Sequence, residues 1–384
     1  MLDHLIGPYK EITWIVPFWP VLVIAFAAAL PGTWLCKQLA LKLGVVDKPD
    51  GSVKTHAHPV AYLGGIGILT GFAAGVIASI LYVGQTEPSG GHLKLLLGIL
   101  AGASVACFVG VVDDLLDIKP SKKLLGQVLA AAILLSVGIR PDLNAFLSPF
   151  GIEMSGLLET ILVIPIVIFF VLGATNSLNL LDGLDGLCAG VTVIITAAML
   201  LLTVHLGTWN SHDIGDPVRL TVSGGLLGAV LGFLPFNRHP AKIFMGDAGS
   251  MLLGFVVAAM MILFATRSPR WWMASILVLG LPILDTAVAL ARRLLNKRPL
   301  FVSDRGHIYD QLIDRGMPLK KTVRICYLLS GLYALLGILL TQLRTRYAGV
   351  VFLLVIIISA VIVWKKGFLK MEGLRGVVKE KNHE

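Results

Sequence analysis

Residues 99–117 read ILAGASVACFVGVVDDLLD, and this stretch decides the class of fold. An apolar run that ends at Val112 leads directly into the acidic cluster Asp113-Asp114-Leu115-Leu116-Asp117, with lysines close behind it. In a soluble protein this cluster would be an ordinary acidic turn. At the end of a membrane helix, carboxylates are costly unless a cation or a function retains them. We therefore expect the cluster to lie where a transmembrane helix meets water and to belong to a site.

The composition of the whole chain also indicates a membrane protein. Of its 384 residues, 56% are hydrophobic and 14% are charged, and the mean hydropathy is +0.84. A soluble protein of this length carries about 25% charged residues. The charges lie in short intervals between apolar runs that lack the period-two alternation of barrel strands. We predict an all-α, polytopic integral membrane protein in which residues 1–384 form one membrane-embedded domain.

The apolar runs predict about eleven transmembrane helices by length and apolarity. The fourth run is short, and the ninth contains Pro282 and Asp285. The predicted spans are 15–35, 62–83, 95–112, 124–139, 157–174, 187–206, 219–235, 250–266, 271–290, 323–342 and 347–364.

The distribution of Lys and Arg predicts the orientation of these helices, because cytoplasmic loops carry the excess of basic residues. Alternate loops divide the 32 Lys and Arg residues unequally, and the poorer set holds only Lys10, Lys94, Arg140, Arg219, Arg267, Arg270, Arg344 and Arg346. The N-terminus is therefore expected outside and the C-terminus in the cytoplasm. The net charge of +9 then falls on the cytoplasmic side and favours anionic partners there, although the ordinary topology signal explains most of the excess.

Five loops on the predicted cytoplasmic side hold the candidate site residues. The topology follows from Lys and Arg alone, so the gathering of the other polar residues on one side is a separate indication of a site. The loops are 36–61, 113–123, 174–186, 236–250 and 292–322.

The acidic cluster has two possible interpretations. If the preceding helix continues through it, Asp113 and Asp117 share a face and Asp114 lies within one turn. Two or three converging carboxylates suit Mg²⁺, which prefers oxygen ligands and often bridges to substrate phosphates. The alternative is a solvated helix end that Lys119, Lys122 and Lys123 neutralise.

The stretch GATNSLNLLDGLDG at 173–186 contains no basic residue. Asn176, Asn179 and Asp182 recur at three-residue spacing along one helical face, and glycines follow Asp182 and Asp185. Those glycines interrupt the helix and expose backbone amides, which suits the binding of a phosphate or a base. Because the acids have no local cation, we expect a functional site here.

The stretch PFNRHPAKIFMGDAGS at 235–250 combines an aromatic residue, basic residues and an acid. Phe244 is a candidate for base stacking, Arg238 and Lys242 are candidates for phosphate contacts, and Asp247 stands just before a new span. Two plainer interpretations stay open, with Phe244 as an interfacial aromatic residue and Asp247 as a helix N-cap.

The remaining candidates lie in the first and last of these loops. Arg305, in the long basic loop, is a candidate for clamping a diphosphate, and His307 for a phosphate contact or proton transfer. A packing or surface role for His307 stays open. Lys54 and His56 are candidate substrate contacts. Asp285 is either next to the site or a buried structural acid.

Taken together, these loops resemble the polyprenyl-phosphate N-acetylhexosamine-1-phosphate transferase family. The similarity extends from Asp47 to about Arg315, with the motifs in order. The most specific motifs are Asn-x-x-Asn-x-x-Asp-Gly-x-Asp-Gly-Leu at 176–187 and Phe-Met-Gly-Asp-x-Gly-Ser at 244–250. The Asp-Asp-x-x-Asp motif is less specific, since soluble prenyl synthases share it.

The resemblance implies a reaction in which undecaprenyl phosphate attacks the β-phosphorus of a UDP-N-acetylhexosamine, with UDP-GlcNAc favoured. UMP leaves, and the lipid-diphospho-sugar initiates cell-envelope polysaccharide synthesis at the cytoplasmic face of the bacterial inner membrane. Mg²⁺ is the expected cofactor, with Mn²⁺ as the alternative ion. The expected partners are these substrates and membrane lipids, without nucleic acid, and a homodimer is left open.

The resemblance also implies roles for individual residues. Asp113 and Asp114 match the pair at the lipid phosphate, one of them a general base. Asp247, together with Asp114, matches the metal ligands. The other matches place Asn179 and the catalytic Asp182 near the diphosphate, and Gly183, Asp185 and Phe244 in a uracil pocket, with Asn237 and Lys54 nearby.

Two departures from the family pattern stand out. The family usually shows His-Ile-His-His, whereas this chain reads His307-Ile308-Tyr309-Asp310. The family often has Pro-Arg-Leu-Gly-Gly, whereas residues 61–65 read AYLGG. The number of spans and the Ser303-Asp304-Arg305 string resemble the sugar-transferring branch more than phospho-N-acetylmuramoyl-pentapeptide transferase.

Two other functions are compatible with membrane carboxylates. A membrane prenyltransferase acting on an aromatic acceptor also uses aspartate clusters with Mg²⁺, but it does not account for the Asn/Asp-Gly stretch. A transporter would place acids in mid-span and show repeat symmetry. The sequence instead places its acids mainly at one membrane face, and it contains no evident repeat.

Overall fold

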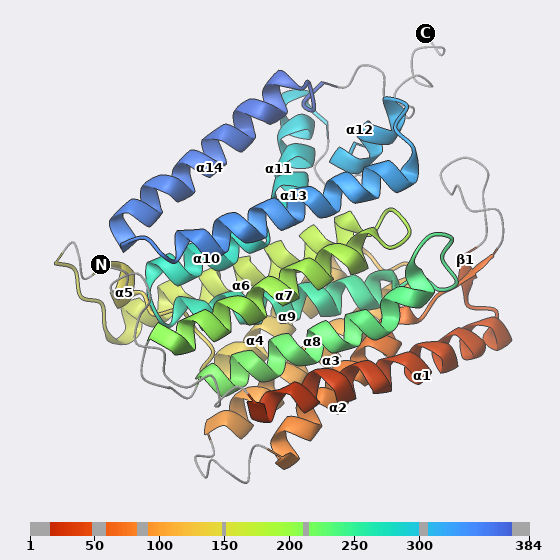
Figure 1. The fold of residues 1–384 in the computed structure, drawn as a ribbon, viewed down its shortest axis with the longest axis horizontal. Helices are drawn as coiled ribbons and strands as arrows, with labels where there is room; N and C mark the ends of the chain where they lie inside the picture. The colour runs from red at the N-terminus through yellow and green to blue at the C-terminus, as the bar shows by residue number, and fades with distance from the viewer. Residues whose placement is uncertain are drawn as a thin grey trace.

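A computed structural model describes residues 16–47, 59–82, 91–147, 151–209, 215–298 and 306–370. These residues form helices joined by short loops, with one two-stranded sheet (Figure 1). The elements are α1 (Trp19–Leu43), β1 (Val46–Asp47), β2 (Val60–Ala61), α2 (Gly64–Tyr82), α3 (Gly91–Leu116), α4 (Pro120–Ser136), α5 (Asn144–Leu147), α6 (Gly156–Leu181), α7 (Leu187–Trp209), α8 (Gly215–Asn237), α9 (Gly246–Ala265), α10 (Pro269–Val278), α11 (Gly280–Leu295), α12 (Ile308–Asp314), α13 (Leu319–Leu340) and α14 (Thr345–Lys365).

Nine helices in the described part of the chain are long and apolar enough to cross a membrane. A tenth span results if α10 and α11 count as one, and these two helices meet at an angle of 71°. The prediction of an all-α polytopic membrane protein is therefore confirmed.

The two runs singled out as unusual are also the ones that differ from simple spans. The run 124–139 corresponds to α4, whose 17 residues rise only about 26 Å at 1.5 Å per residue. The run 271–290 is divided at Leu279, where α10 ends and α11 turns away. Asp285 lies on α11, beyond this bend.

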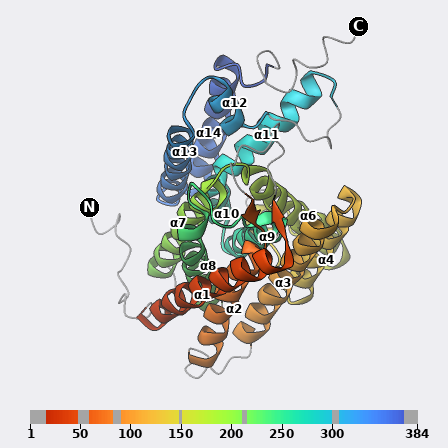
Figure 2. The same cartoon turned by 90° about the vertical axis from the view of Figure 1, so that its right-hand side faces the viewer.

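Helix α9 is the centre of the structure. Figures 1 and 2 show α9 inside the bundle, with α3, α6, α7 and α8 around it, and residue contacts join it to each of them. Every α9 residue except Asp247 is buried. A helix that is apolar on all sides has no face to offer to water, so the other helices enclose it.

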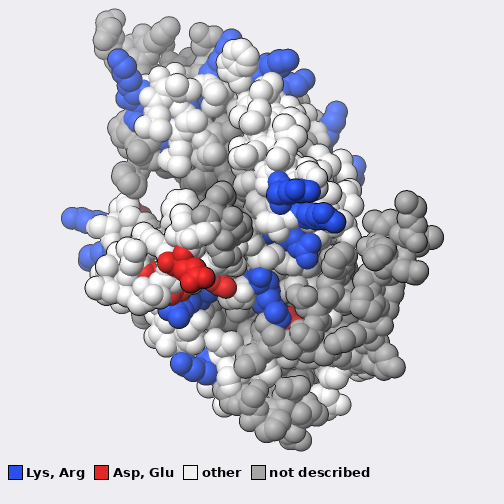
Figure 3. All heavy atoms as spheres, turned by 90° about the vertical axis from the view of Figure 1, so that its left-hand side faces the viewer, with Lys and Arg blue, Asp and Glu red and all other residues white. Residues whose placement is uncertain are grey.

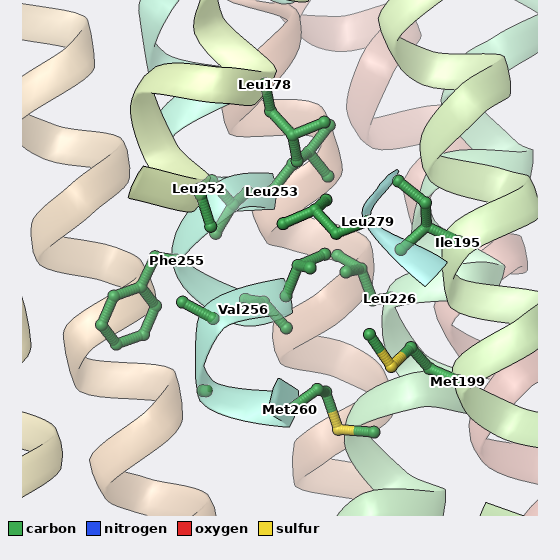
Figure 4. Packing of buried hydrophobic residues seen from close by; sticks show 14 of the residues in the cluster. Leu178, Ile195, Met199, Leu226, Leu252, Leu253, Phe255, Val256, Met260 and Leu279 are labelled. Carbon is green, nitrogen blue, oxygen red and sulfur yellow. The ribbon is translucent and has the colours of Figure 1, made fainter. Parts of the chain in front are cut away.

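The core around α9 consists of interlocking aliphatic and sulfur-containing side chains (Figure 4). Leu252, Val256 and Met260 of α9 lie among residues from other helices, such as Leu178 of α6 and Met199 of α7. In a membrane, helices associate through this close van der Waals packing, because lipid tails are as apolar as the side chains.

Glycines let two helices approach the start of α9 almost backbone to backbone. A Cβ atom on Gly65 of α2 would lie 2.2 Å from the backbone nitrogen of Gly249. A Cβ atom on Gly110 of α3 would lie 2.4 Å from the Cα of Ala248. This close approach brings the carboxyl end of α3 and the amino end of α2 to Asp247, the half-buried residue of α9.

A small sheet covers the same end of the bundle. In this sheet Val46 pairs with Ala61 in antiparallel register, and Ala61 forms a further parallel bridge to Ile243. The backbone N–H of Gly64 then donates to the carbonyl of Phe244 at 3.0 Å. These contacts bind the segment before α2 to the segment before α9.

The opposite end of the bundle holds the other terminus of α9. Arg219 is fully buried and donates from Nη2 to the carbonyl of Leu263 at 2.8 Å, while its Nη1 donates to Asp216 at 2.6 Å. The last carbonyls of a helix lack intrahelical partners, so Arg219 satisfies one of them. Figure 3 looks onto this end and shows both basic and acidic groups on it.

Candidate active site

Four helix ends meet where α9 begins. They are the last turn of α3 with Asp113 and Asp114, the first turn of α4 with Lys123, the last turn of α6 with Asn179, and the first turn of α9 with Asp247. Side-chain contacts join all four ends. The predicted convergence of loops 113–123, 174–186 and 236–250 is therefore present in the structure.

Lys123 stands at the middle of this group. Its ammonium contacts the Asp247 carboxylate, lies 3.1 Å from Oδ2 of Asp113 and donates to Oδ1 of Asn179 at 3.2 Å. Burial by itself lowers the pKa of Lys123, but the carboxylates of Asp247 and Asp113 outweigh this effect and raise the pKa above its usual value. Lys123 is therefore a fixed positive charge among three side-chain oxygens.

Asp114 faces the backbone of α9. Its Oδ1 accepts the N–H of Asp247 at 2.8 Å, and its Oδ2 accepts the N–H of Ala248 at 3.1 Å. These N–H groups belong to the first turn of α9 and have no intrahelical acceptor. Asp114 thus acts as an N-cap supplied by another helix. The predicted metal and base roles of Asp114 remain predictions, since the structure shows it positioning Asp247.

Asp113 and Asp117 do not act together. The carboxylate of Asp113 faces Lys123 and also accepts the N–H of Ile118 at 3.1 Å. Helix α3 ends at Leu116, and Asp117 is exposed with a φ of 47°. The N–H of Asp117 still donates to the carbonyl of Asp113 at 2.8 Å, but the left-handed backbone at Asp117 ends the helix there, so Asp117 shapes the helix end.

Two asparagines of α6 have different partners. Asn179 donates from Nδ2 to Oδ1 of Asp247 at 2.7 Å and to Ser250 at 3.0 Å. Asn176, nearly one turn earlier, donates to Oε1 of Gln127 on α4 at 2.9 Å. Asn179 therefore belongs to the centre of the site, whereas Asn176 joins α6 to α4 behind it.

Asp182 closes α6 and begins the turn that leads to α7. Burial is the main reason why its pKa is raised from 3.8 to about 8, and the charges of Asp247, Asp114 and Asp185 add to the effect. The last turn of a helix also disfavours a negative charge, because the helix dipole is negative there. Asp182 is thus suited to carry a proton near neutral pH.

The residues predicted for a uracil pocket lie beside one another. Asp185 accepts the N–H of Ala241 at 3.0 Å and contacts Nδ1 of His239 at 2.8 Å. Asn237 is buried, accepts the N–H of Gly186 at 3.2 Å and donates to the carbonyl of Ile243 at 3.0 Å. Asn237 thus connects the two loops from inside. Direct contacts to a nucleotide would then come from residues around it.

Phe244 lies at the edge of the same region. Its ring makes an edge-on contact with Tyr62, with centroids 6.0 Å apart. Tyr62 occupies the position where the family often has Arg, and burial raises its pKa, as do several nearby carboxylates. Lys242 is exposed on the adjoining loop, where its side chain is accessible to an anion.

His307 is held by the acid whose role the sequence left open. Asp285 contacts Nδ1 of His307 at 2.7 Å through one oxygen and accepts the N–H of Ile308 at 2.6 Å through the other. The buried Asp285 therefore fixes the start of α12. The ring of Tyr309 stacks on His307 at 5.4 Å between centroids, and its hydroxyl donates to the carbonyl of Leu180 at 2.9 Å.

Some predicted site residues fall outside the described part of the chain. These are Lys54, His56 and Arg305. Their roles remain predictions. Of the other candidates, Asp113, Asn179 and Asp247 share one contact group, and Gly183 and Asp185 lie on the neighbouring turn.

Sequence reasoning missed the central role of Lys123, which it had treated as one of three neutralising lysines. The residue types alone do not separate Lys123 from Lys122. The only signal available was helical periodicity, since α4 begins at Pro120 and turns Lys123 toward the bundle while Lys122 stays exposed. Gln127, one turn further along the same face, was missed for the same reason.

The side-chain oxygens around Lys123 are the atoms that a divalent cation at this site would use as ligands. No group of three or more His, Cys, Asp or Glu side chains with metal-binding geometry occurs among the described residues. Asp113, Asp247 and Asn179 nevertheless direct oxygens toward one cationic nitrogen. Mg²⁺ commonly takes one or two protein carboxylates and completes its shell with water and substrate phosphates. The residues present therefore fit Mg²⁺.

Comparison with known proteins agrees with this arrangement. The profile of glycosyl transferase family 4 matches residues 96–265, which include Asp113, Lys123, Asn179 and Asp247. The probable undecaprenyl-phosphate N-acetylglucosaminyl 1-phosphate transferase of Bacillus subtilis (strain 168) is 32% identical over 320 residues, covering 83% of each chain. The chain belongs to glycosyl transferase family 4.

Other members of family 4 are similar over comparable lengths. The decaprenyl-phosphate N-acetylglucosaminephosphotransferase of Mycobacterium tuberculosis (strain CDC 1551 / Oshkosh) is 29% identical over 83% of this chain and 82% of its own length. The phospho-N-acetylmuramoyl-pentapeptide-transferase of Shouchella clausii (strain KSM-K16) is 31% identical over 83% of this chain and 95% of its own. The similarity to family 4 thus extends across both branches considered from the sequence.

Proposed function

We propose that this protein transfers GlcNAc 1-phosphate from UDP-GlcNAc to undecaprenyl phosphate and releases UMP. The relatives from Bacillus subtilis and Mycobacterium tuberculosis carry polyprenyl phosphate and N-acetylglucosamine in their names, which supports this acceptor class and this sugar. The observation that carries the proposal is the contact group of Lys123, Asp113, Asn179 and Asp247 at one end of a membrane bundle.

The proposed reaction exchanges one phosphoanhydride bond, that of the UDP-sugar, for another, that of the lipid-diphospho-sugar. A lipid phosphate oxygen attacks the β-phosphorus of the donor, a new P–O–P bond forms, and the bond to the UMP oxygen breaks. Both reactants are anions, so positive charge at the reacting phosphorus lowers the barrier. Lys123 supplies such a charge, and Asp113 beside it is the candidate group that takes a proton from the lipid phosphate.

Mg²⁺ would be held by Asp247, with oxygens of Asp113 or Asn179 nearby, and it would neutralise the diphosphate and the departing UMP. The residues of the chain do the positioning. Asp114 fixes the backbone of Asp247, and Asn179 fixes its side chain through Oδ1. On the donor side, the turn that carries Gly183 and Asp185 bonds the N–H of Ala241 in the loop that leads to Phe244, which supports a place for the uracil ring there.

The charge pattern supports a location for the reaction. We infer that the site faces the cytoplasm of a bacterium, across its inner membrane, because the basic loops lie on that side. UDP-sugars are cytoplasmic, so the donor would reach Lys123 directly from water. The product would serve as the first lipid-linked sugar of a cell-envelope polysaccharide. Self-association as a homodimer stays a prediction.

The deciding experiment is UMP release by the purified full-length protein in detergent. Undecaprenyl phosphate, Mg²⁺ and a panel of UDP-N-acetylhexosamines would be supplied, and UDP-GlcNAc is expected to give the highest kcat/KM. Asp113→Asn should lose turnover, and Asp117→Asn is the matched control because Asp117 is an exposed acid of the same cluster. Pyrophosphate release from a prenyl diphosphate, with no UMP from any UDP-sugar, would establish the prenyltransferase instead. The absence of turnover with both substrate sets would favour a transporter.

A further inference from the structure

The turn from Asp182 to Gly186 connects α6 to α7 and carries two of the residues assigned above to the donor side, Gly183 and Asp185. Segments with few buried contacts open locally at low free energy, so hydrogen bonds to the backbone of this turn help to hold its geometry. On one side, Asp185 and Asn237 bond it to the loop before α9. The other side faces α12 and α13, which supply a different kind of contact.

Tyr309 of α12 holds the beginning of this turn. Its hydroxyl donates to the carbonyl of Leu180 at 2.9 Å, one of the last carbonyls of α6, which have no intrahelical partner. The fit is close, because a Cβ atom on Gly183 would lie 2.2 Å from the Tyr309 hydroxyl. Tyr309 is buried, and its own place is set by its stacking on His307.

Tyr327 of α13 holds the end of the same turn. Its hydroxyl donates to the carbonyl of Gly186 at 2.6 Å, and Gly186 has a φ of +75°, which favours glycine. A Cβ atom on Gly190 would lie 2.1 Å from this hydroxyl. Two tyrosine hydroxyls from neighbouring helices thus bond carbonyls at the two ends of one turn, six residues apart.

Tyr309 and Tyr327 are held in place by contacts of α12 and α13 with the bent pair of helices α10 and α11 and with α7. Asp285 of α11 binds His307 and the N–H of Ile308. It therefore fixes the first turn of α12, which carries Tyr309. Helix α13, which carries Tyr327, packs against α7, α10 and α11. The two tyrosines therefore connect the donor-side turn to α12 and α13, helices that supply no side chain to the Lys123 group.

We infer that Tyr309 and Tyr327 are positioning residues that hold the Asp182–Gly186 turn in the geometry that binds the nucleotide half of the donor. This inference rests on the proposed function, because it takes Gly183 and Asp185 as donor contacts. The two hydroxyls bond the backbone of the turn and not Lys123 or Asp113, the residues proposed above to act on the lipid phosphate. Loss of either hydroxyl should therefore weaken donor binding and leave the lipid acceptor unaffected.

The test removes single oxygen atoms. Tyr309→Phe and Tyr327→Phe should each raise the KM for UDP-GlcNAc about fivefold, the effect of one net hydrogen bond, with the KM for undecaprenyl phosphate unchanged. The double variant should give a rise of about tenfold, short of the product, because both hydroxyls act on one turn. Tyr333→Phe is the matched control, since its hydroxyl bonds Ser359 at 2.6 Å between α13 and α14, away from the turn.

Hydrogen exchange of the backbone amides at 180–190 gives a second measurement that does not require turnover. Faster exchange there in the two variants, together with the split between donor and lipid KM, supports the inference. Unchanged donor KM, or equal rises for donor and lipid, overturns it. If the wild type releases no UMP, the proposed function fails. Equilibrium binding of UDP then decides whether the two tyrosines position a nucleotide site. Weaker binding by the tyrosine variants than by Tyr333→Phe would then support the inference, and equal binding would reject it.

Discussion

Asp114 caps the helix that begins with Asp247. Its two carboxylate oxygens accept the N–H groups of Asp247 and Ala248 at 2.8 and 3.1 Å, although 133 residues separate Asp114 from Asp247 in the sequence. A Cβ atom on Gly246 would lie 2.4 Å from Oδ2 of Asp114, so the helix start and the carboxylate fit closely. The pair of acids at 113 and 114 thus divides into one that faces Lys123 and one that orients Asp247.

Asp114→Asn should therefore lower both stability and activity. An amide offers one acceptor oxygen where the carboxylate offers two, which leaves a helix-start N–H without a partner and costs about 1–3 kcal/mol. The thermal midpoint should fall, and UMP release should drop at least about tenfold because Asp247 loses its orientation. Asp113→Asn is the comparison, and it should lose activity with little change in the midpoint. A variant at 114 that keeps wild-type stability while losing turnover would assign Asp114 to the chemistry itself.

Lys123→Met should reduce kcat/KM by about 100-fold or more, because it removes the fixed charge between Asp113 and Asp247 and leaves two carboxylates facing each other. The control is Lys122→Met, which removes an exposed charge from the adjacent position. Steady-state UMP release measures both. Equal, small effects of the two substitutions would show that Lys123 only neutralises the helix end.

Gly65→Ala should destabilise the bundle by several times the roughly 1 kcal/mol scale of helix propensity, because the added carbon would lie 2.2 Å from the backbone of Gly249. Gly331→Ala provides the contrast, since no atom lies within 4 Å of the added carbon on α13. That substitution should be neutral or slightly stabilising, because alanine is the better helix former. Thermal midpoints in the same detergent compare the two, and similar midpoints would contradict the close packing of α2 against α9.

The raised pKa of Asp182 predicts a pH dependence of stability. Between the ordinary value of 3.8 and the folded value of about 8, the folded protein binds a proton that the unfolded chain has released. Stability should therefore decrease as the pH rises from about 4 to about 8 and then level off. Asp182→Asn should lack this decrease. The thermal midpoint of the variant minus that of the wild type should therefore be larger at pH 8 than at pH 5. Thermal midpoints without Mg²⁺ measure it, and parallel curves would refute a raised pKa.

Chelation should abolish UMP release, and added Mg²⁺ should restore it. Asp247→Asn should require far more Mg²⁺ for half-maximal activity than Asp117→Asn, because only Asp247 belongs to the oxygen group around Lys123. A Mg²⁺ titration of both variants provides the measurement. Full activity in the presence of excess EDTA would exclude the proposed cation.

Much of the fold and part of the site could be predicted from local pattern. The apolar runs located the membrane helices, and the polar stretches at 113–123, 174–186 and 236–250 marked the helix ends that meet. Helical spacing also placed Asn179 on the inner face of α6. The same spacing grouped Asn176 with it, which the structure separates because Asn176 lies nearly one turn deeper and meets Gln127.

The sequence by itself determined the class of protein, the family and the positions of the polar loops, because apolar length and motif spacing are local properties of the chain. Only the tertiary structure decided which side chains meet. Lys123 contacts Asp247 across 124 residues, and Tyr309 reaches Leu180 across 129. Such contacts depend on how closely α2, α3 and α6 approach α9, and packing between helices, which no local pattern records, sets that distance.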